Sequence, residues 1–396
     1  MKRRDFLKNS ALASSVMFAP NFVNAANNLV FTNTGQKRLV IIQLSGGNDG
    51  LNTVIPVDND IYYKNRPNIA IEKNKALQLN DTISLNPNLI GLQKLYDKGN
   101  LCIINNVGYP NPDRSHFRST DIWQTASDSN QFFKYGWVGR YLDQNAKFAY
   151  QAIELDDSLS LALKGKELNG IATKNPEAFF KASNDPFFNQ LLRQKTDAHL
   201  SEHNLGYLYK TMTDAKSSAK YINEKNTIID TRISYPNSNF GKQLKTTANL
   251  INSNINTQIF YTSLDGFDTH VNQEKRQGGL LKTYAECLEV FVNDLKQNGT
   301  FKDTLILTFS EFGRRVSQNA AKGTDHGAAN NVFVVGDQLK KQGFYNDLAT
   351  LEDLDDNGDI KYDIDFREIY ATILNKWLNV DDTTILTQKF KRLNFI

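Results

Sequence analysis

Acidic and histidine residues recur in four short segments of the sequence that also contain glycine. These segments are residues 45–50, 265–270, 310–315 and 323–327. Their residues with the chemistry to hold a cation are Asp49, Asp268, His270, Glu311 and His326. Carboxylate oxygens and imidazole nitrogens are ordinary ligands of divalent metal ions, and the neighbouring glycines allow close backbone approach. Each segment alone is a weak signal, but the set predicts a metal site for zinc, manganese, magnesium or calcium.

Ser115 is a candidate nucleophile at the start of a predicted helix. Ser115 is expected to open a helix, either itself or with His116 as the first helical residue. A hydroxyl there would face the positive end of the helix dipole, and a neighbouring dication would make it a stronger nucleophile. A serine that merely caps the helix fits the residues equally well. Thr53 is a weaker alternative nucleophile.

Two arginines lie in or beside these segments. Arg114 and Arg314 are expected to hold an anionic substrate through forked hydrogen bonds to its oxygens. The same two residues would also fit surface ion pairs, which contribute little to stability.

All these residues must be positioned by the apolar elements between them. Short apolar runs predict buried strands, and segments with a one-sided apolar stripe predict helices. The strands are 38–44, 101–104, 257–264, 304–309 and 332–335, and the helices are 88–98, 115–125, 279–296 and 365–378. Because strands and helices alternate and the strands are apolar throughout, we expect an α/β fold with a largely parallel central sheet and helices on both faces.

The polar segments would then meet at one edge of that sheet. Three of them directly follow predicted strands, and the fourth lies shortly before strand 332–335. Open parallel sheets bind ligands outside the carboxyl ends of their strands. We therefore expect Asp49, Asp268, His270 and Glu311 to lie together there, with His326 joining them through its loop.

The domain organisation is expected to be simple. Residues 26–396 show neither an internal repeat nor a Gly/Pro linker, which predicts a single domain. Residues 150–255 are rich in Asn, Lys, Ser and Thr and have intermittent helical patterning. We interpret this span as a helical insertion or cap.

The first 25 residues have the order of a secretory signal. A basic start with Arg3 and Arg4 precedes an apolar stretch over 11–20 and a small-residue cleavage pattern that ends at Ala25. Paired arginines before Phe-Leu-Lys indicate the twin-arginine variant. This predicts contact with the twin-arginine export machinery and a periplasmic or otherwise exported location; an ordinary signal or a basic tail is the alternative.

Composition excludes several other classes of protein. The chain has 46 Lys and Arg against 43 Asp and Glu, and these become equal once residues 1–25 are left out. A chain without net positive charge lacks the basic character typical of nucleic-acid-binding proteins, so we expect no nucleic-acid partner. No second apolar run is long enough to span a bilayer, so we expect no membrane span in the mature protein. Cys102 and Cys287 either form one bridge or remain two buried thiols.

Four ordered motifs together resemble an exported family known only as domain of unknown function 1501. They are Ser45-Gly46-Gly47-Asn48-Asp49-Gly50, Arg114-Ser115-His116-Phe117, Ser310-Glu311-Phe312-Gly313-Arg314 and Gly323-Thr324-Asp325-His326-Gly327. The segment 365–378 fits the same family, so the resemblance spans almost all of the chain after the signal. It implies a distant relation to the alkaline phosphatase and sulfatase superfamily, and therefore an alkaline-phosphatase-like sheet.

That superfamily uses a hydroxyl nucleophile and one or two metals at the strand ends. The resemblance implies that Asp49 is the ligand after the first strand, that Asp268 and His270 form a ligand pair, and that His326 is the late histidine ligand. Ser115 would be the nucleophile, without the cysteine-containing sulfatase signature. Glu311 stands where an Asp-His pair is usual.

We therefore expect an exported, metal-dependent hydrolase-like protein that acts on phosphate or sulfate esters, in small molecules or polymers, through a serine nucleophile. Two alternatives stay open. One is a non-catalytic exported binding or assembly protein that retains the fold. The other is a structural remnant whose polar residues do not meet in space.

Overall fold

The computed structural model describes residues 35–193, 203–229 and 233–396. The predicted signal segment, residues 1–25, lies outside the described residues, so the twin-arginine interpretation stays a prediction. Within the described ranges, no helix combines the length and apolar character needed to cross a membrane.

A central sheet of nine strands organises the chain. Its order is β11-β5-β10-β9-β1-β8-β6-β7, and β12 also pairs with β5. The strands are β1 (Arg38–Ser45), β5 (Leu101–Gly108), β6 (Ala152–Glu154), β7 (Ile171–Ala172), β8 (Ile259–Asp265), β9 (Thr304–Phe309), β10 (Asn330–Val335), β11 (Gly343–Phe344) and β12 (Ile364–Asp365). Strand β1 runs parallel to both β8 and β9, whereas β10 is antiparallel to β9 and to β5. The predicted fold class is confirmed, with β10 as the reversed strand.

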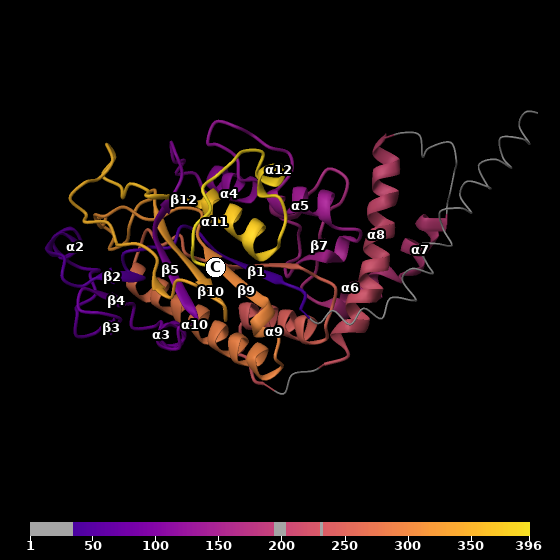
Figure 1. Cartoon of the computed structure of the whole chain (residues 1–396), viewed down its shortest axis with the longest axis horizontal. Coiled ribbons are helices and arrows are strands. Elements are labelled where there is room, and N and C mark those ends of the chain that lie inside the picture. The colour runs from indigo at the N-terminus through magenta and orange to yellow at the C-terminus, as the bar shows by residue number, and fades with distance from the viewer. Residues whose placement is uncertain (1–34, 194–202, 230–232) are drawn as a thin grey trace, which may run out of the picture. The chain divides into compact units, whose positions relative to one another are not determined.

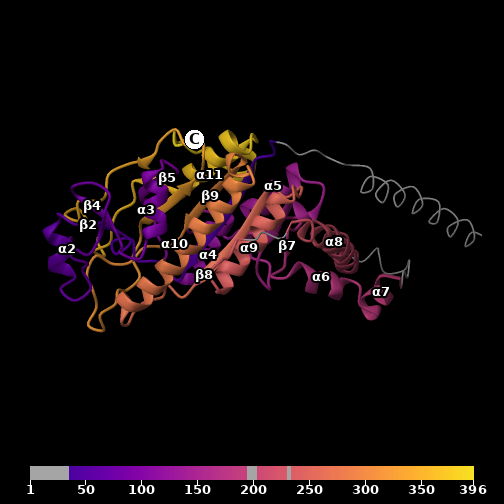
Figure 2. The ribbon, with the colours of Figure 1, turned by 90° about the horizontal axis from the view of Figure 1, so that it is seen from below.

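Helices cover both faces of this sheet. Alternate residues of β1 point to opposite faces, so Leu39 and Ile41 join one hydrophobic core, and Val40 and Ile42 join the other. The first core also holds residues of α4 (His116–Thr125), α5 (Trp137–Asn145), α11 (Phe366–Thr372) and α12 (Asp382–Leu386). The second holds residues of α3 (Ile90–Asp97), α9 (Asn239–Asn252) and α10 (Gln273–Gln297). Figure 1 shows these two layers above and below the sheet, and Figure 2 shows α10 lying between α3 and α9.

Smaller elements complete the description. A second sheet of β2 (Val54–Pro56), β4 (Ile83–Leu85) and β3 (Leu77–Gln78) lies near α2 (Asp60–Asn65), as Figures 1 and 2 show. The remaining helices are η1 (Ala149–Gln151), η2 (Leu161–Leu163), α6 (Pro176–Ser183), α7 (Pro186–Arg193), α8 (His203–Asn226), η3 (Phe301–Asp303) and the π-helical turn η4 (Ile373–Trp377). The described part of the span 150–255 thus holds four α-helices together with β6 and β7 at the end of the sheet. Its interpretation as an insertion or cap stays a prediction.

Strand direction decides which loops share an edge. The parallel strands β1, β8 and β9 end at the same edge of the sheet. Because β10 is antiparallel to β9, it begins at that edge, and β5, antiparallel to β10, ends there. The segments after β1, β5, β8 and β9 and the segment before β10 therefore meet in space.

The two cysteines are free and buried. Cys102 of β5 belongs to the core on one face of the sheet, and Cys287 of α10 belongs to the core on the other. Of the two sequence alternatives, two buried thiols are confirmed. Burial raises the pKa of Cys102 to about 12, so this thiol stays protonated.

Candidate metal centre

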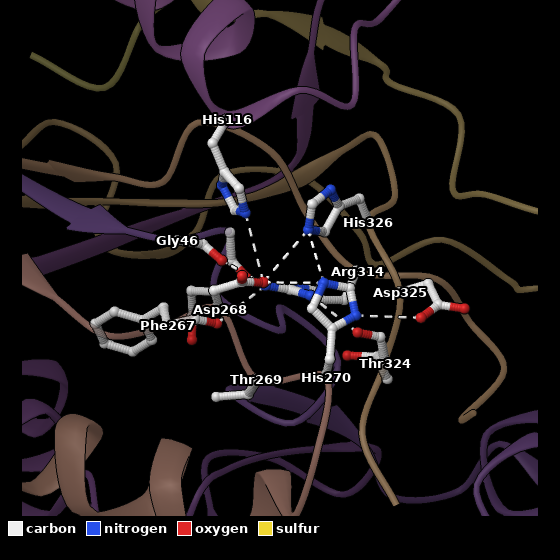
Figure 3. A network of polar contacts seen from close by, with 12 residues as sticks. Gly46, His116, Phe267, Asp268, Thr269, His270, Arg314, Thr324, Asp325 and His326 are labelled. Atoms are coloured by element: carbon white, nitrogen blue, oxygen red, sulfur yellow. Dashed lines mark hydrogen bonds and ion pairs between the residues drawn. The ribbon is translucent and has the colours of Figure 1, made fainter. Parts of the chain in front are cut away.

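Three histidines converge on one carboxylate oxygen at the shared edge. The Oδ1 atom of Asp268 lies 3.0 Å from Nε2 of His270, 3.3 Å from Nε2 of His326 and 3.4 Å from Nε2 of His116. The Nε2 atoms of His270 and His326 are 2.9 Å apart. Figure 3 shows the three rings directed at Asp268 from different sides.

The four ligands come from three separate stretches of chain. His116 is the first residue of α4, in the segment that follows β5. Asp268 and His270 lie in the loop between β8 and α10. His326 lies before β10 and forms an isolated antiparallel bridge with Arg314, in the segment after β9. The sheet edge is therefore what brings the four side chains together.

The other nitrogen of every ring faces a hydrogen-bond acceptor. These contacts are Nδ1 of His116 to Oε1 of Glu311 at 3.0 Å, Nδ1 of His270 to Oδ1 of Asp325 at 3.2 Å, and Nδ1 of His326 to the carbonyl oxygen of Arg114 at 2.7 Å. A carbonyl or an ionised carboxylate can only accept, so each Nδ1 carries the hydrogen. In the neutral rings each Nε2 then presents a lone pair, which is the arrangement of histidines that bind metals.

The donor geometry fits a small cation. Three Nε2 lone pairs and a carboxylate oxygen repel one another unless positive charge lies between them. Ligand atoms around a tetrahedral zinc ion lie about 3.3 Å apart when each bond is about 2.0 Å. The separations of 3.0–3.4 Å at Asp268 are close to this spacing, and single ligand atoms of His116, Asp268 and His326 all lie within 4.8 Å of one another.

Arg314 holds the loops around the centre. Its side chain is 0 % exposed, and Nη2 donates to Oδ1 of Asp268 at 2.8 Å. Its other hydrogen bonds go to the carbonyl oxygens of Gly46, Gly47, Phe267 and Thr324. Burial opposes ionisation of Asp268, but the hydrogen bond and charge of Arg314 outweigh it and lower the pKa to about 2. Arg314 thus positions a ligand and has no free nitrogen for the substrate contact expected from the sequence.

Gly46 allows the first loop to pack against the ligand loop. Its φ is +115°, and a Cβ atom at this position would lie 2.4 Å from the backbone nitrogen of Asp268. A side chain would therefore separate the loop after β1 from the loop after β8. The close backbone approach expected from the sequence occurs here.

Glu311 is buried behind the histidines. It is 1 % exposed, and its Oε1 accepts from the backbone nitrogen of Gly46 at 2.8 Å as well as from His116. Its hydrogen bond raises the pKa of His116. Glu311 reaches the centre as the partner of a ligand, so we assign it to orienting His116.

Asp49 lies in a separate buried cluster. It is 1 % exposed, and its two oxygens accept from Arg66, from Gln273 Nε2 and from the backbone nitrogen of Leu51. Its carboxylate is satisfied by these contacts, so we do not include it among the ligands. The structure brings Asp268, His270 and His326 together as expected and adds His116, which the sequence indicated only as the start of a helix.

The segment before α4 holds the candidate nucleophile. Ser115 is exposed and is the N-cap of α4, but its hydroxyl makes no capping hydrogen bond. The expected helix start is confirmed, since α4 begins at His116. Arg114 is engaged by two carboxylates, Asp359 at 2.8 Å from its Nε and Asp355 at 3.3 Å from its Nη2. Arg114 therefore contributes its carbonyl to His326 and its charge to an ion pair.

The weaker alternative, Thr53, is fully buried. Its hydroxyl donates to the carbonyl oxygen of Asp49 at 2.7 Å, which makes it part of the turn after β1. It has no route to a substrate in this arrangement.

An open cleft of about 430 Å³ lies beside the centre. Its lining comes from the ends of β1 and β8, the first turns of α4 and the segment after β9. These residues are Ser45, Gly46, His116, Phe117, Thr120, Asp121, Asp265, Gly266, Asp268 and Glu311. Two ligands of the centre thus face a space that can admit a substrate.

Solved structures share this fold only distantly. The C-terminal periplasmic domain of EptC from Escherichia coli is 11 % identical, with 91 % of this chain and 90 % of that chain covered at a TM-score of 0.41. The lipoteichoic acid synthase LtaP from Listeria monocytogenes is 10 % identical, with 89 % and 76 % covered at 0.41. The alkaline phosphatase from the Antarctic bacterium TAB5 is 9 % identical, with 76 % and 91 % covered at 0.35. All three TM-scores are below 0.5, so we draw no conclusion about the activity of this chain from these structures.

Comparison of the sequence with protein-family models identifies the family of this chain. No curated protein matches it significantly. A family model matches residues 102–390, which is well over half of the sequence. This span includes all four residues of the candidate centre, His116, Asp268, His270 and His326. The chain therefore belongs to the family described as "Protein of unknown function (DUF1501)", as its motifs indicated.

Proposed function

We propose that this protein is a metal-dependent hydrolase of phosphate or sulfate esters whose ion is bound by His116, Asp268, His270 and His326. One observation carries the proposal: three Nε2 lone pairs face one carboxylate oxygen, while each Nδ1 is held by an acceptor. A cation bound between these four acceptors would relieve their mutual repulsion, and the acceptors at each Nδ1 are the partners that metal-binding histidines use.

The donor set favours zinc among the ions expected from the sequence. Three imidazole nitrogens around one carboxylate oxygen are a donor set typical of zinc. Magnesium and calcium prefer six or more oxygen ligands, and the centre offers nitrogen. A bound zinc ion would act as a Lewis acid toward an ester oxygen and stabilise the negative charge that develops there.

The chain itself supplies the surroundings for a reaction. The first turn of α4 has backbone N–H groups without acceptors inside the helix, and these carry the positive end of its dipole toward an anion. Ser115 stands at this helix start with a hydroxyl that does not cap it. We therefore propose Ser115 as the nucleophile. The ester's charge would be met by the ion and by α4, because Arg114 and Arg314 are engaged elsewhere.

Metal analysis tests the centre first. Purified protein incubated with zinc and then dialysed should hold roughly one zinc ion per chain by mass spectrometry of the metal. His326→Ala and His116→Ala should each lose it, whereas the control Asp97→Asn, an exposed residue of α3, should keep it. Wild-type protein that stays free of zinc, with unchanged thermal stability, would refute the centre.

An ester panel then tests the reaction. Zinc-loaded protein should release p-nitrophenol from at least one of p-nitrophenyl phosphate, bis(p-nitrophenyl) phosphate and p-nitrophenyl sulfate. Ser115→Ala should abolish turnover and keep the zinc. Zinc binding without turnover of any ester would favour the second candidate, a non-catalytic binding protein that uses the same pocket.

A further inference from the structure

The cleft beside the metal centre is lined by negative charge. Asp121, Asp265, Asp268 and Glu311 all line it, and no Lys or Arg is among its lining residues in the described part of the chain. Asp121 and Asp265 form no ion pair with another described residue, whereas Asp268 is paired with Arg314 and Glu311 is buried. The carboxylates of Asp121 and Asp265 therefore act on whatever enters the cleft.

Three arginines in the segments that form the cleft are engaged by other groups. Arg314 is fully buried, and Arg114 is held by Asp355 and Asp359. Arg118 of α4 donates to backbone carbonyls of residues 128 and 129 and lies 4.0 Å from the ring centre of Phe132. None of the three can balance a second negative charge on a substrate.

The two carboxylates that line the cleft come from different elements of the fold. Asp121 lies one turn after Phe117 on α4, so both face the cleft from the helix that begins with His116. Asp265 is the last residue of β8, directly before the loop that carries Asp268 and His270. A substrate bound to the ion would thus share the cleft with both carboxylates.

We propose that this cleft selects esters with a single negative charge, phosphodiesters or sulfate monoesters, over dianionic phosphate monoesters, and that Asp121 and Asp265 determine this selectivity. The inference rests on the proposed function, because it assumes that the ester binds at the His116, His270, His326 and Asp268 centre. The physical reason is Coulomb repulsion. A dianionic ester is attracted more strongly by the metal ion, but it is also repelled by the two carboxylates, which have no counter-ions among the described residues. A monoanionic ester experiences half of that repulsion.

Kinetics of the zinc-loaded protein test the selectivity. We expect kcat/KM to be at least about tenfold higher for bis(p-nitrophenyl) phosphate or p-nitrophenyl sulfate than for p-nitrophenyl phosphate, at a pH where the monoester is a dianion. Asp121→Asn and Asp265→Asn should each narrow this ratio by about threefold, and the double variant by about tenfold. The control Asp97→Asn should leave the ratio unchanged. The two monoanions show which kind of ester is preferred.

Equilibrium binding separates this inference from the proposed function. Titration calorimetry should show dimethyl phosphate, a monoanion, binding more tightly than methylphosphonate measured as a dianion, with the difference reduced in the double variant. This result would support the selectivity even if Ser115→Ala showed that turnover follows another route. Preference for p-nitrophenyl phosphate in the wild type would overturn it. Loss of zinc from Asp121→Asn or Asp265→Asn would also overturn it, because these residues would then be ligands.

Discussion

Glu311 offers a direct test of how the centre is built, because one buried carboxylate oxygen joins a ligand to a neighbouring loop. Its Oε1 accepts from His116 Nδ1 at 3.0 Å and from the Gly46 backbone nitrogen at 2.8 Å. Glu311→Ala removes both acceptors. Loss of the partner of a metal-binding histidine weakens metal affinity by about 10- to 100-fold, which corresponds to roughly 1.4–2.7 kcal/mol.

Glu311→Gln separates charge from geometry. Both contacts are made by the same oxygen, so a Gln amide oxygen can still accept from His116 and Gly46 without the negative charge. We expect zinc affinity to fall by about tenfold in the Gln variant and about 100-fold in the Ala variant. The Ala variant should also lose about 1–3 kcal/mol of stability without metal, because the Gly46 N–H is left without its acceptor.

Competition with a chromophoric chelator measures the zinc affinity, and denaturant unfolding of the metal-free protein measures the stability. Glu286→Gln, an exposed position on α10, is the matched control. The reasoning is refuted if Glu311→Ala binds zinc within twofold of wild type, because His116 would then need no partner to act as a ligand.

Three further predictions follow from buried charges. Asp49→Asn should keep the full zinc content but lose about 3–5 kcal/mol in denaturant unfolding, because Arg66 stays buried without its carboxylate; loss of zinc would restore Asp49 as a ligand. Arg114→Ala should lose about 2 kcal/mol, because buried Asp359 loses its partner, and metal analysis should find the zinc retained; an unchanged unfolding free energy would contradict this role. Burial raises the pKa of Glu154 to about 7 from 4.5, so the folded state keeps a proton that the unfolded state releases. The contribution of Glu154 to stability should therefore be fully present below about pH 4.5 and fall by roughly 3 kcal/mol as the pH rises through 7. Unfolding measured across this range should show a flatter profile in Glu154→Gln, and parallel profiles would argue against the shift.

The sheet could be predicted well from the sequence because its strands are buried. Runs such as 38–44 and 304–309 are apolar throughout, and the structure places β1 and β9 there. An apolar run does not encode strand direction, however, so the reversal of β10 could not be foreseen. The reversal matters because it brings the segment before β10, with His326, to the edge where the other strands end.

Ligands and their partners were harder to tell apart. Asp49 and Asp268 both follow a strand in a glycine-containing loop, and local sequence does not distinguish them. What separates them is Arg66, which comes from α2's C-terminal end and buries its charge against Asp49. His116 was missed as a ligand because it is surrounded by residues typical of a helix start, and its role depends on Glu311, nearly two hundred residues later.

The start of α10 shows a similar limit. The apolar stripe predicted a helix from Gly279, but α10 begins at Gln273. Its extra turns are held by side-chain contacts across the fold, including Gln277 Nε2 to the Asp49 carbonyl at 2.9 Å. Neither these contacts nor the extra turns that they stabilise are visible as a hydrophobic periodicity in the sequence.

The placement of the three imidazoles has a mechanical consequence. They come from the start of α4, the loop after β8 and the approach to β10, and the two cysteines lie apart on opposite faces of the sheet. An ion held by these rings would be a reversible cross-link between the three segments. Within the described ranges, no disulfide connects them. The resistance of this edge to unfolding would then rise with the free zinc concentration, by about 1.4 kcal/mol for each tenfold increase above the dissociation constant.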